Sequence, residues 1–418
     1  MITRVLVANR GEIARRVFAT CRRLGIGTVA VYTDPDAHSP HVAEADARVR
    51  LQGTRGYLDP AQLIAAAEAA GADAIHPGYG FLSENAEFAA AVQDAGLTWI
   101  GPPVAAVAAM GSKIEAKKIM SAAGVPVLEE LDPDTVTADM LPVLIKASAG
   151  GGGRGMRVVR DLTELADQVQ AAQREAQSAF GDPTVFCERY LDSGHHVEVQ
   201  VMADAHGTVW AVGERECSIQ RRHQKIIEEA PSPLVERVAG MRDKLFEAAR
   251  LAATAIGYTG AGTVEFMASG QGDFFFLEMN TRLQVEHPVT ELTSGLDLVE
   301  LQLSIAGGAP LEPAPPPSRG SSIEARLYAE DPAKDWQPQA GIVHRFSVPN
   351  AATDFGLLDR TGVRLDAGIA DGSVISVFYD PMIAKVISYA PTRRHAAALL
   401  TDALTRARIH GVRTNRDL

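Results

Sequence analysis

The sequence predicts a mixed α/β and α+β protein with a parallel α/β domain first, a flexible glycine-loop lid next and a mostly antiparallel domain last. Three observations lead to this prediction. From Thr3 to about Gly111, short β-rich runs alternate with amphipathic stretches, which is the rhythm of a parallel sheet covered by helices. A run of glycines at 150–155 lies between two strand-like segments, and short strands dominate from Thr184 onward.

The first region is expected to alternate strand and helix throughout. Its first turn reads ANRGEIARR and lacks the three-glycine fingerprint that brings a pyrophosphate to a helix N-terminus, so a dinucleotide site is not expected. The expected elements are, in order, a strand TRVLVA, a helix that ends at Leu24 before Gly25, a strand TVAVYT, a helix opened by Asp59 and Pro60, a strand at 74–76, a helix after Ser83 and a strand at 98–101.

The second region is built around the glycine run. A helix is expected over 113–123, followed by a strand LIKAS at 144–148 and a strand RVV after the glycines. Walker and Rossmann loops lead into a helix, whereas these glycines join two strands. We therefore expect a flexible hairpin that closes over a phosphate through its backbone amides. Asp161 is the expected N-cap of the next helix, with Glu164 three residues on.

The third region is expected to form an antiparallel sheet. Its strands include TVFCERYL, HVEVQVMA, TVWAVGE, TVEFM at 263–267 and FFFLEMN at 274–280, the last two joined by a turn that contains glycine. PAPPP at 313–317 is typical of a linker. The strands SIEARLYA, SVISVFY and AKVISYA follow it, with a helix from Arg393.

Composition narrows the class of protein. The chain has 418 residues, of which 46% are hydrophobic and 22% charged, as expected of a globular enzyme with several domains. Its net charge of −12, with basic residues spread along the chain, disfavours nucleic acid or an anionic membrane as a partner. Three widely spaced cysteines fit neither a disulfide framework nor a zinc site, and apolar runs are too short for a membrane helix. A cytoplasmic protein is expected.

One cluster of polar residues points to metal chemistry. Residues two apart on a strand share a face, so Glu278, Asn280 and Arg282 are expected to project together. Glu265 comes from the preceding strand of the same hairpin. Carboxylate and amide oxygens suit Mg²⁺ or Mn²⁺ bridging nucleotide phosphates, with Arg282 beside an anionic substrate. The alternative is a solvated strand face with a cross-strand charge pair. Lys146, on the strand before the glycines, favours the metal site because it adds a cation for phosphate.

Six stretches of the chain share a recognisable pattern: ANRGEIA (8–14), HPGYGFLSEN (76–85), IKAS with GGGGRGM (145–156), RHQK (222–225), GAGTVEF (260–266) and EMNTRLQVEHPVTE (278–291). Together they resemble the biotin carboxylase family of ATP-grasp enzymes, and the resemblance runs from residue 2 to about 417. It implies an ATP-grasp fold. The expected domains are 1–112 as the N-terminal biotin carboxylase domain, 113–191 as the lid domain with the glycine-rich loop, and 192–418 as the ATP-grasp catalytic domain with the C-terminal biotin carboxylase domain.

The resemblance implies a nucleotide site and its chemistry. Family members use MgATP to convert bicarbonate into carboxyphosphate, whose CO₂ is captured by N1′ of biotin. Glu265, Glu278 and Asn280 would hold the Mg²⁺ or Mn²⁺ ions that offset charge as the γ-phosphoryl group moves. The implied ATP-binding residues are Lys113 and Lys146 at the phosphates, Gly151, Gly152, Gly153 and Met156 in the lid, Glu188, Arg189 and Leu191 at the adenine edge, and His196, Gln220 and His223 at ribose and phosphates.

The bicarbonate site is implied by the QVEH segment. Glu286 resembles the family base that takes the proton of bicarbonate, so that the bicarbonate oxygen attacks the γ-phosphorus. Arg282, Gln284, Val285 and Lys225 would surround the anion.

The biotin site is implied by two residues. Arg326 resembles the family arginine that stabilises the enolate-like oxygen of deprotonated biotin, and Tyr79 would pack against the biotin ring. Without the resemblance, Arg326 would be taken as a surface ion pair with Glu324 or Glu330, and His196 and His223 as structural histidines.

Two departures from the family pattern concern the lid. The segment between Val127 and Pro142 is shorter than usual, which we expect to alter the kinetics of lid closure. Arg189 stands where lysine is common, and we expect this change to be tolerated because the position faces adenine largely through main-chain groups.

Two other functions stay open at this stage. In another ATP-grasp ligase an amine would attack the acyl phosphate, but Tyr79, Arg326 and the QVEH segment disfavour it. A silent ATP-binding scaffold would not need the metal, base and lysine set.

The resemblance implies partners outside this chain. No lysine here has methionine on both sides, so the biotin carrier domain is expected beyond Leu418 or on a separate chain. A carboxyltransferase β subunit would choose the final acyl-CoA. We expect these 418 residues to be the front of a longer acyl-CoA carboxylase α subunit that forms a homodimer or larger assembly.

Overall fold

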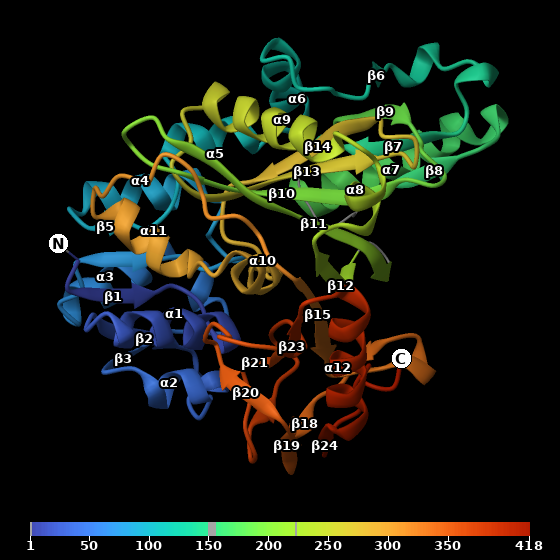
Figure 1. Cartoon of the computed structure of the whole chain (residues 1–418). Coiled ribbons are helices and arrows are strands. Elements are labelled where there is room, and N and C mark those ends of the chain that lie inside the picture. Colours follow the sequence, from blue (N-terminus) through green and yellow to red (C-terminus); the bar gives the residue numbers. More distant parts are fainter. Residues whose placement is uncertain (1, 149–155, 222–223) are drawn as a thin grey trace.

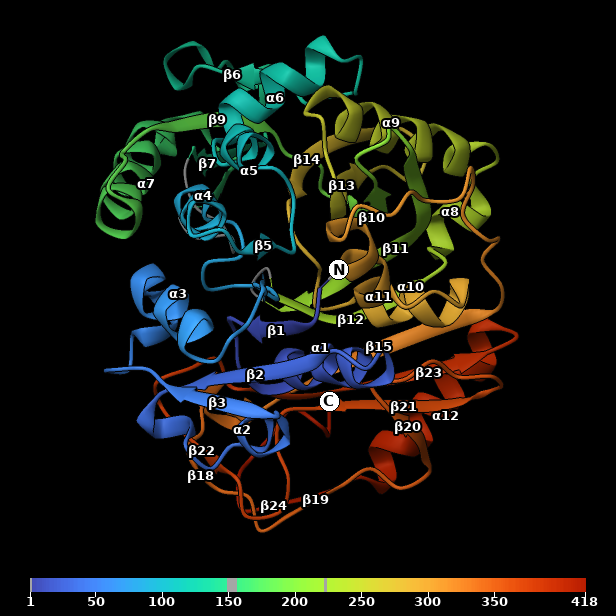
Figure 2. The same cartoon turned by 90° about the vertical axis from the view of Figure 1, so that its left-hand side faces the viewer.

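The computed structural model describes residues 2–148, 156–221 and 224–418 (Figure 1). The predictions for Gly151, Gly152, Gly153 and His223 lie outside these residues. In both views the N-terminal elements in blue lie against the C-terminal strands in red, and the lid elements in teal and green lie at the opposite end (Figures 1 and 2). In the described ranges, no helix has both the length and the apolar character that crossing a bilayer requires.

The N-terminal domain has the predicted parallel sheet, with strand order β3-β2-β1-β4-β5. Asp59 caps the third helix by accepting a hydrogen bond from the amide of Gln62, as its position in the sequence predicts. The strands are β1 (Arg4–Val7), β2 (Gly27–Tyr32), β3 (Ala47–Arg50), β4 (Ala74–His76) and β5 (Thr98–Trp99); the helices are α1 (Gly11–Arg23), α2 (Pro40–Glu44), α3 (Pro60–Ala69), α4 (Ala86–Asp94) and α5 (Val104–Met110), with short 3₁₀ turns at Asp34–Asp36 and Gly56–Leu58.

The lid contains a four-stranded sheet in the order β6-β9-β7-β8. β7 (Val143–Ala147) and β8 (Arg157–Val159) pair antiparallel, which confirms that the glycine run joins two strands. The other elements are α6 (Lys113–Ala122), β6 (Glu130–Leu131), α7 (Leu165–Phe180) and β9 (Val185–Arg189), with 3₁₀ turns at Pro133–Thr135, Ala138–Met140 and Leu162–Glu164. Asp161 caps the 3₁₀ turn instead of the α-helix, so α7 begins four residues after it.

The lid sheet and α6 belong to different hydrophobic cores. Val143, Ile145 and Leu165 form a small core between the lid sheet and α7. Ala116 and Met120 of α6 instead enter the core of the next domain, where α6 packs against α9 (Met241–Ala255). The predicted boundaries at 112 and 191 stay predictions.

The rest of the chain forms a nine-stranded sheet in the order β14-β13-β10-β11-β12-β15-β23-β21-β20. Neighbouring strands are antiparallel except β20 and β21, which are parallel. The strands are β10 (His195–Ala203), β11 (Val209–Arg221), β12 (Gln224–Ala230), β13 (Gly260–Ala268), β14 (Phe274–Asn280), β15 (Ser321–Tyr328), β20 (Ala351–Asp354), β21 (Gly362–Ala367) and β23 (Met382–Ala390).

The remaining elements cover this sheet or extend it. The helices are α8 (Pro233–Arg237), α10 (His287–Ser294), α11 (Leu298–Ala306) and α12 (Arg393–Arg406), with a 3₁₀ turn at Pro332–Lys334. Three small antiparallel pairs join β16 (Glu330–Asp331) to β17 (Gln337–Pro338), β18 (Gly341–Ile342) to β22 (Val374–Ile375), and β19 (Arg345–Ser347) to β24 (Arg408–His410).

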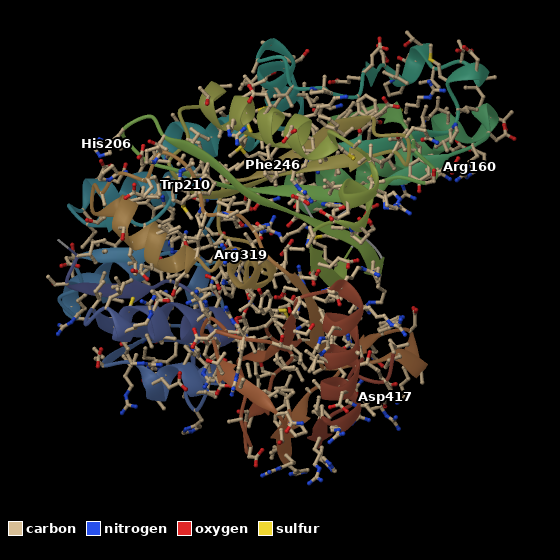
Figure 3. All side chains as sticks on the ribbon, viewed as in Figure 1. Arg160, His206, Trp210, Phe246, Arg319 and Asp417 are labelled. Carbon is tan, nitrogen blue, oxygen red and sulfur yellow. The ribbon has the colours of Figure 1, made fainter. Side chains whose placement is uncertain are left out.

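The proline-rich segment at 313–317 does not divide the large sheet. β12 and β15 lie on either side of it in the sequence and pair directly, with Ile227 opposite Ala325. Trp210 Nε1 donates to the carbonyl of Glu312 at 2.7 Å (Trp210 is labelled in Figure 3). Glu312, just before the segment, is therefore held to the sheet, whereas 313–317 itself is an irregular and mostly exposed connection between α11 and β15.

Candidate active site

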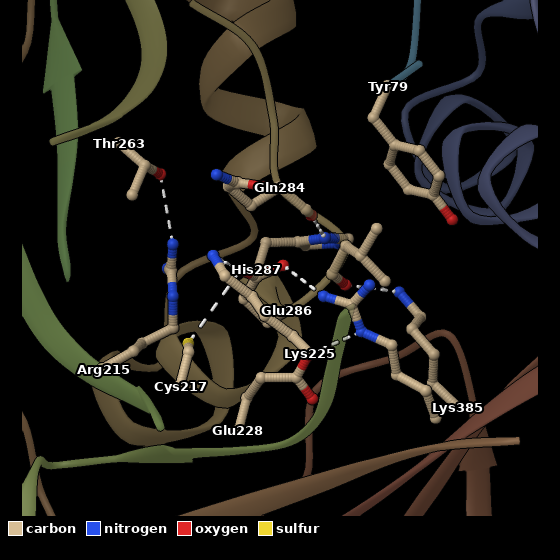
Figure 4. A network of polar contacts seen from close by, with 12 residues as sticks. Tyr79, Arg215, Cys217, Lys225, Glu228, Thr263, Gln284, Glu286, His287 and Lys385 are labelled. Atoms are coloured by element: carbon tan, nitrogen blue, oxygen red, sulfur yellow. Dashed lines mark hydrogen bonds and ion pairs between the residues drawn. The ribbon is translucent and has the colours of Figure 1, made fainter. Parts of the chain in front are cut away.

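The candidate site is built around Glu286, in the turn between β14 and α10, where it precedes the first residue of α10. Its side chain is fully buried. Lys225 Nζ donates to Glu286 Oε1 at 2.7 Å, and Arg326 Nη2 donates to Oε2 at 3.0 Å (Figure 4). Burial opposes ionisation, but Lys225, Arg326 and Arg215 outweigh it and hold the pKa of Glu286 well below its usual value. Glu286 is therefore ionised at neutral pH and able to accept a proton.

Two buried side chains hold the backbone that precedes Glu286. His287 Nδ1 donates to the carbonyl of Gln284 at 2.7 Å, and Lys385 Nζ donates to the carbonyl of Val285 at 2.9 Å (Figure 4). Burial, followed by the nearby Lys385, lowers the pKa of His287 well below its usual value, so the ring is neutral with its proton on Nδ1. Sequence analysis missed Lys385 because it lies a hundred residues from the carbonyl that it holds.

Lys225 connects the predicted base to the predicted metal ligands. Besides Glu286, its ammonium donates to Glu198 Oε2 at 2.5 Å and to Glu265 Oε1 at 2.9 Å. Burial disfavours the charged amine, but Glu198, Glu265 and Glu286 outweigh it and raise the pKa of Lys225 well above its usual value. Glu198 is a second residue that sequence analysis missed. The available signal was the alternation HVEV, which puts Glu198 on the same face of β10 as His196.

The predicted metal ligands lie together on the β13–β14 hairpin. Glu265 and Glu278 are directly opposed across the strand pair, and Asn280 Nδ2 donates to Glu265 Oε1 at 2.8 Å. Burial and the neighbouring Glu265 carboxylate raise the pKa of Glu278. No hydrogen bond or ion pair joins Glu278 to another described residue. A half-buried carboxyl without such a partner, opposite a second carboxylate, fits a divalent cation.

His196 lies with these acidic residues. Its Nε2 atom is 2.7 Å from Glu265 Oε2 and 3.8 Å from Glu198 Oε2, and the three side chains are close enough to share an ion. Burial lowers the pKa of His196, but Glu265 outweighs it and the net shift is upward. The contact to ribose or phosphate that was predicted for His196 stays a prediction.

Arg282 joins the metal hairpin to the N-terminal domain. Its guanidinium donates to Asn280 Oδ1 at 2.9 Å, to Gln284 Oε1 at 2.9 Å and to Glu84 Oε2 at 2.8 Å. Glu84 belongs to the HPGYGFLSEN stretch, so one arginine ties two of the recognised stretches together. Arg282, Gln284, Val285, Glu286 and Lys225 are thus brought into one cluster, as the predicted bicarbonate site requires.

The predicted nucleotide residues fall into two groups. The first group lies near the metal hairpin. Gln220 Nε2 is 3.3 Å from His196 Nδ1. Lys113 lies close to Glu278, and its charge lowers the pKa of that carboxyl, although burial and Glu265 raise the pKa by more. Lys146 instead donates to Glu188 Oε2 at 2.5 Å, inside the lid. For Met156, Arg189 and Leu191, the described residues show no side-chain bond to the cluster around Glu286, and their roles stay predictions.

Arg326 is buried on β15 between two carboxylates. Besides the bond to Glu286, its Nε atom donates to Glu228 Oε1 at 2.5 Å. The surface ion pair with Glu324 or Glu330, which was the alternative for Arg326, is therefore wrong. Burial raises the pKa of Glu228 to about 7, with Arg326 acting against it, and burial raises the pKa of Glu324 well above its usual value.

Tyr79 lies in a tight turn that follows β4. Its hydroxyl donates to Glu12, and its ring faces the region of Lys385 in Figure 4. The amide of Gly78 donates to His76 Nδ1 at 2.9 Å, and Asn9 Nδ2 donates to the carbonyl of Tyr79 at 2.7 Å. Gly78 has a φ of 65°, and a Cβ there would come within 2.8 Å of Asn9 Nδ2. Glycine is therefore required for this turn, which sets the direction of Tyr79.

Comparison with protein families covers almost the whole chain. Residues 1–107 match "Biotin carboxylase, N-terminal domain", residues 105–314 match "Carbamoyl-phosphate synthase L chain, ATP binding domain", and residues 324–418 match "Biotin carboxylase C-terminal domain".

Curated relatives match over nearly all of this chain. The chain is 46% identical to the α subunit of mitochondrial methylcrotonoyl-CoA carboxylase from Glycine max, over 99% of this chain and 57% of the relative. It is 46% identical to biotin carboxylase 2 of Bacillus subtilis, over 100% of this chain and 95% of the relative. The chain thus spans less than two thirds of the length of the methylcrotonoyl-CoA carboxylase subunits that it resembles.

Two solved structures have the same fold. The biotin carboxylase of Campylobacter jejuni, solved with a β,γ-ATP compound, superposes with a TM-score of 0.93 at 40% identity, covering 100% of this chain and 94% of that one. The biotin carboxylase domain of 2-oxoglutarate carboxylase from Hydrogenobacter thermophilus, a dimer solved with MgADP, ADP and bicarbonate, gives 0.92 at 41% identity, covering 100% and 92%.

Proposed function

The chain belongs to the biotin carboxylase family of ATP-grasp enzymes, and we propose that it carboxylates biotin with bicarbonate and ATP as the first half-reaction of an acyl-CoA carboxylase. One observation carries the proposal. Glu286 is a buried, ionised carboxylate held between Lys225 and Arg326, next to the hairpin of Glu265 and Glu278. This places a base and two cations beside a site suited to a phosphate-bound metal.

In the first step bicarbonate binds where Arg282 and Lys225 supply positive charge. A local positive charge is needed because the whole chain has a net charge of −12 and would otherwise repel an anion. Glu286 takes the bicarbonate proton, and the oxygen so released attacks the γ-phosphorus of ATP. The bond from that phosphorus to the bridging oxygen breaks, giving ADP and carboxyphosphate. Glu286 is aligned for this proton because its backbone is held by Lys385 and His287.

Glu265, Glu278 and Asn280 are the residues that would hold Mg²⁺ or Mn²⁺, with His196 and Glu198 adjacent. When bound, a divalent cation neutralises negative charge on the phosphate oxygens. Lys113 and Lys146 would add positive charge toward the same phosphates.

In the second step the C–O bond of carboxyphosphate breaks to give CO₂ and phosphate, the released phosphate takes the N1′ proton of biotin, and N1′ forms a bond to the carbon of CO₂. The negative charge that develops on the ureido oxygen needs a fixed cation, and Arg326 supplies one that is already buried and oriented by Glu228. Tyr79 would support the biotin ring from the N-terminal domain. Arg326 would serve both steps, since it also donates to Glu286, the base of the first step.

The two other functions fit these observations less well. A ligase that passes an acyl phosphate to an amine has no use for Arg326 beside the base, and the match over 324–418 is to a biotin carboxylase domain. A silent scaffold does not require a buried carboxylate surrounded by three cations. Removing these charged groups from water costs folding free energy.

Partners of the chain are proposed from its relatives. One relative is named as the α chain of propionyl-CoA carboxylase, and we propose a biotin carrier domain and a carboxyltransferase β subunit as partners of this chain. One matching structure is of a domain dimer, and we propose that this chain also forms a homodimer or larger assembly. A cytoplasmic location is proposed because Cys21, Cys187 and Cys217 are buried and unpaired.

The test measures ADP release in a factorial design. Bicarbonate and free biotin are each supplied or omitted, and ammonia replaces biotin in one arm. We expect sustained ADP release with MgATP only when bicarbonate and biotin are both present. Sustained ADP release in the arm that contains ammonia in place of biotin would support the amine ligase and overturn the proposal. No release in any arm, from protein that binds ATP, would support the scaffold.

A further inference from the structure

Two lysines share one buried carboxylate in the lid. Glu188 on β9 accepts from Lys146 of β7 through Oε2 at 2.5 Å and from Lys117 of α6 through Oε1. All three side chains are almost completely buried: the exposed fraction is 11% for Lys146, 7% for Lys117 and 2% for Glu188. Sequence analysis assigned Lys146 and Glu188 to the nucleotide and gave Lys117 no role.

Lys117 links the lid to the body of the protein. It lies on α6, whose Ala116 and Met120 pack into the core of the large domain, whereas Glu188 lies on the lid sheet. Its ammonium also donates to the carbonyl of Leu128 at 2.9 Å. Its neighbour Lys118 is exposed, and among the described residues it pairs only with Glu115, at 2.8 Å. The two adjacent lysines therefore have the same chemistry but different surroundings.

The charges in this trio do not balance. One carboxylate is matched by two ammonium groups, so Glu188 keeps a cation if either lysine leaves. If Lys146 moved to the triphosphate and no second lysine were present, Glu188 would become a buried charge without a partner, which is strongly unfavourable. With Lys117 in place, Glu188 stays paired after Lys146 has left.

We propose that Lys117 is a positioning residue for ATP binding, which holds Glu188 so that Lys146 is free to move from this carboxylate to the phosphates of the nucleotide. The proposal rests on the proposed function, because it takes Lys146 to be a phosphate contact. It assigns to Lys117 no contact with ATP itself. Lys117 acts by keeping Glu188 ion-paired and in place on β9, where the adenine edge is predicted.

The informative variant is Lys117→Gln, which removes the charge and keeps a donor of similar length. Lys146 then becomes the only cation on Glu188, so its withdrawal costs more and the affinity for nucleotide falls. We expect the dissociation constant of a non-hydrolysable MgATP analogue, measured by calorimetry, to rise about tenfold, the equivalent of about 1.4 kcal/mol. The KM for ATP should rise in parallel, with kcat changed much less. Lys117→Arg, which keeps the charge, should stay within about threefold of wild type, well under 1 kcal/mol.

Three comparisons make the test specific. Lys118→Gln is the matched control and should leave nucleotide affinity unchanged. In a Glu188→Gln background the carboxylate charge is gone, so Lys117→Gln should have less than about a twofold effect, below 0.5 kcal/mol. Lys146→Ala tests the underlying function, since it should weaken binding whether or not Lys117 matters.

The outcomes separate the two claims. An equal loss of affinity from Lys117→Gln with and without Glu188→Gln would overturn the role of Lys117, as would an unchanged affinity or an equal loss in Lys117→Arg. Unaltered binding by Lys146→Ala would instead overturn the assignment of Lys146 and the proposal with it. Thermal unfolding of each variant, followed by circular dichroism, shows whether the compared proteins are folded. If Lys117→Gln does not fold, Lys117→Arg is compared with wild type instead.

Discussion

Glu286 owes its ionised state to its surroundings. A buried carboxyl without partners would hold its proton, but Lys225, Arg326 and Arg215 reverse this effect and lower the Glu286 pKa. Under the proposed function, bicarbonate bound at Lys225 would withdraw part of this compensation. Glu286 would then be a stronger base for the bicarbonate proton.

Glu286→Gln keeps the shape and hydrogen-bonding reach of this side chain but removes the base. Turnover that depends on bicarbonate should fall by about 10²–10⁴, because general-base catalysis contributes that much. MgATP affinity should change little, because the metal hairpin and the lid lysines are intact. Steady-state ADP release and calorimetric ATP titration measure the two quantities. Near-normal ADP release dependent on biotin would show that Glu286 is not the base.

At this scale the family resemblance pointed to residues both inside the six stretches, such as Glu286, and outside them, such as Arg326, but it missed others that act from a distance. Glu265, Glu278 and Glu286 lie in contiguous segments whose spacing already suggests a shared face. Lys117, Glu198 and Lys385 lie outside the quoted stretches, and their roles come from contacts across strands and domains. No local pattern distinguishes Lys117, which is buried, from Lys118, which is exposed.

Among the elements, the turn after β4 depends on a neutral histidine. His76 Nδ1 accepts from the amide of Gly78, and Nε2 lies 3.2 Å from Gln302 Oε1, to which it donates. Burial lowers the pKa of His76 from 6.5 to about 4. The unfolded chain protonates this ring near pH 6.5 and the folded chain only near pH 4. Its stabilising contribution is therefore complete above pH 6.5 and declines as the pH falls toward 4.

His76→Asn removes this titration. Between pH 7 and pH 5 the wild type should lose about 2 kcal/mol more unfolding free energy than the variant, since each pKa unit corresponds to about 1.4 kcal/mol. Urea unfolding of both proteins at the two pH values measures the difference. An equal loss in both proteins would show that His76 titrates normally in the folded state.

Most elements of the N-terminal domain were predicted, although α2, β3 and α5 were not, and for the large sheet several strands were predicted but their order was not. Two helices of the N-terminal domain begin at a local marker, because the side chains of Asp59 and Asn85 cap α3 and α4. The order of the nine-stranded sheet rests on pairings such as β12 with β15, which join segments about a hundred residues apart. The segment at 313–317 is an irregular, mostly exposed connection, as its composition predicts, but composition does not show that β12 and β15 on either side of it pair in one sheet.

For the whole molecule, we propose that biotin is carried outside these 418 residues. No lysine in the chain lies between two methionines, and Lys117, Lys146 and Lys385 are buried. After incubation with biotin ligase, ATP and biotin, mass spectrometry of this 418-residue chain should show no specific adduct. A biotinylated lysine at any one position would contradict this division of labour.

The central claim is that bicarbonate itself attacks ATP at the site of Glu286. Bicarbonate labelled with ¹⁸O tests it directly when it is supplied with MgATP and free biotin. The attacking oxygen stays on phosphorus when carboxyphosphate releases CO₂, so we expect inorganic phosphate that carries one oxygen from bicarbonate. Phosphate without label, from protein that cleaves ATP, would show that water attacks instead and would contradict the account.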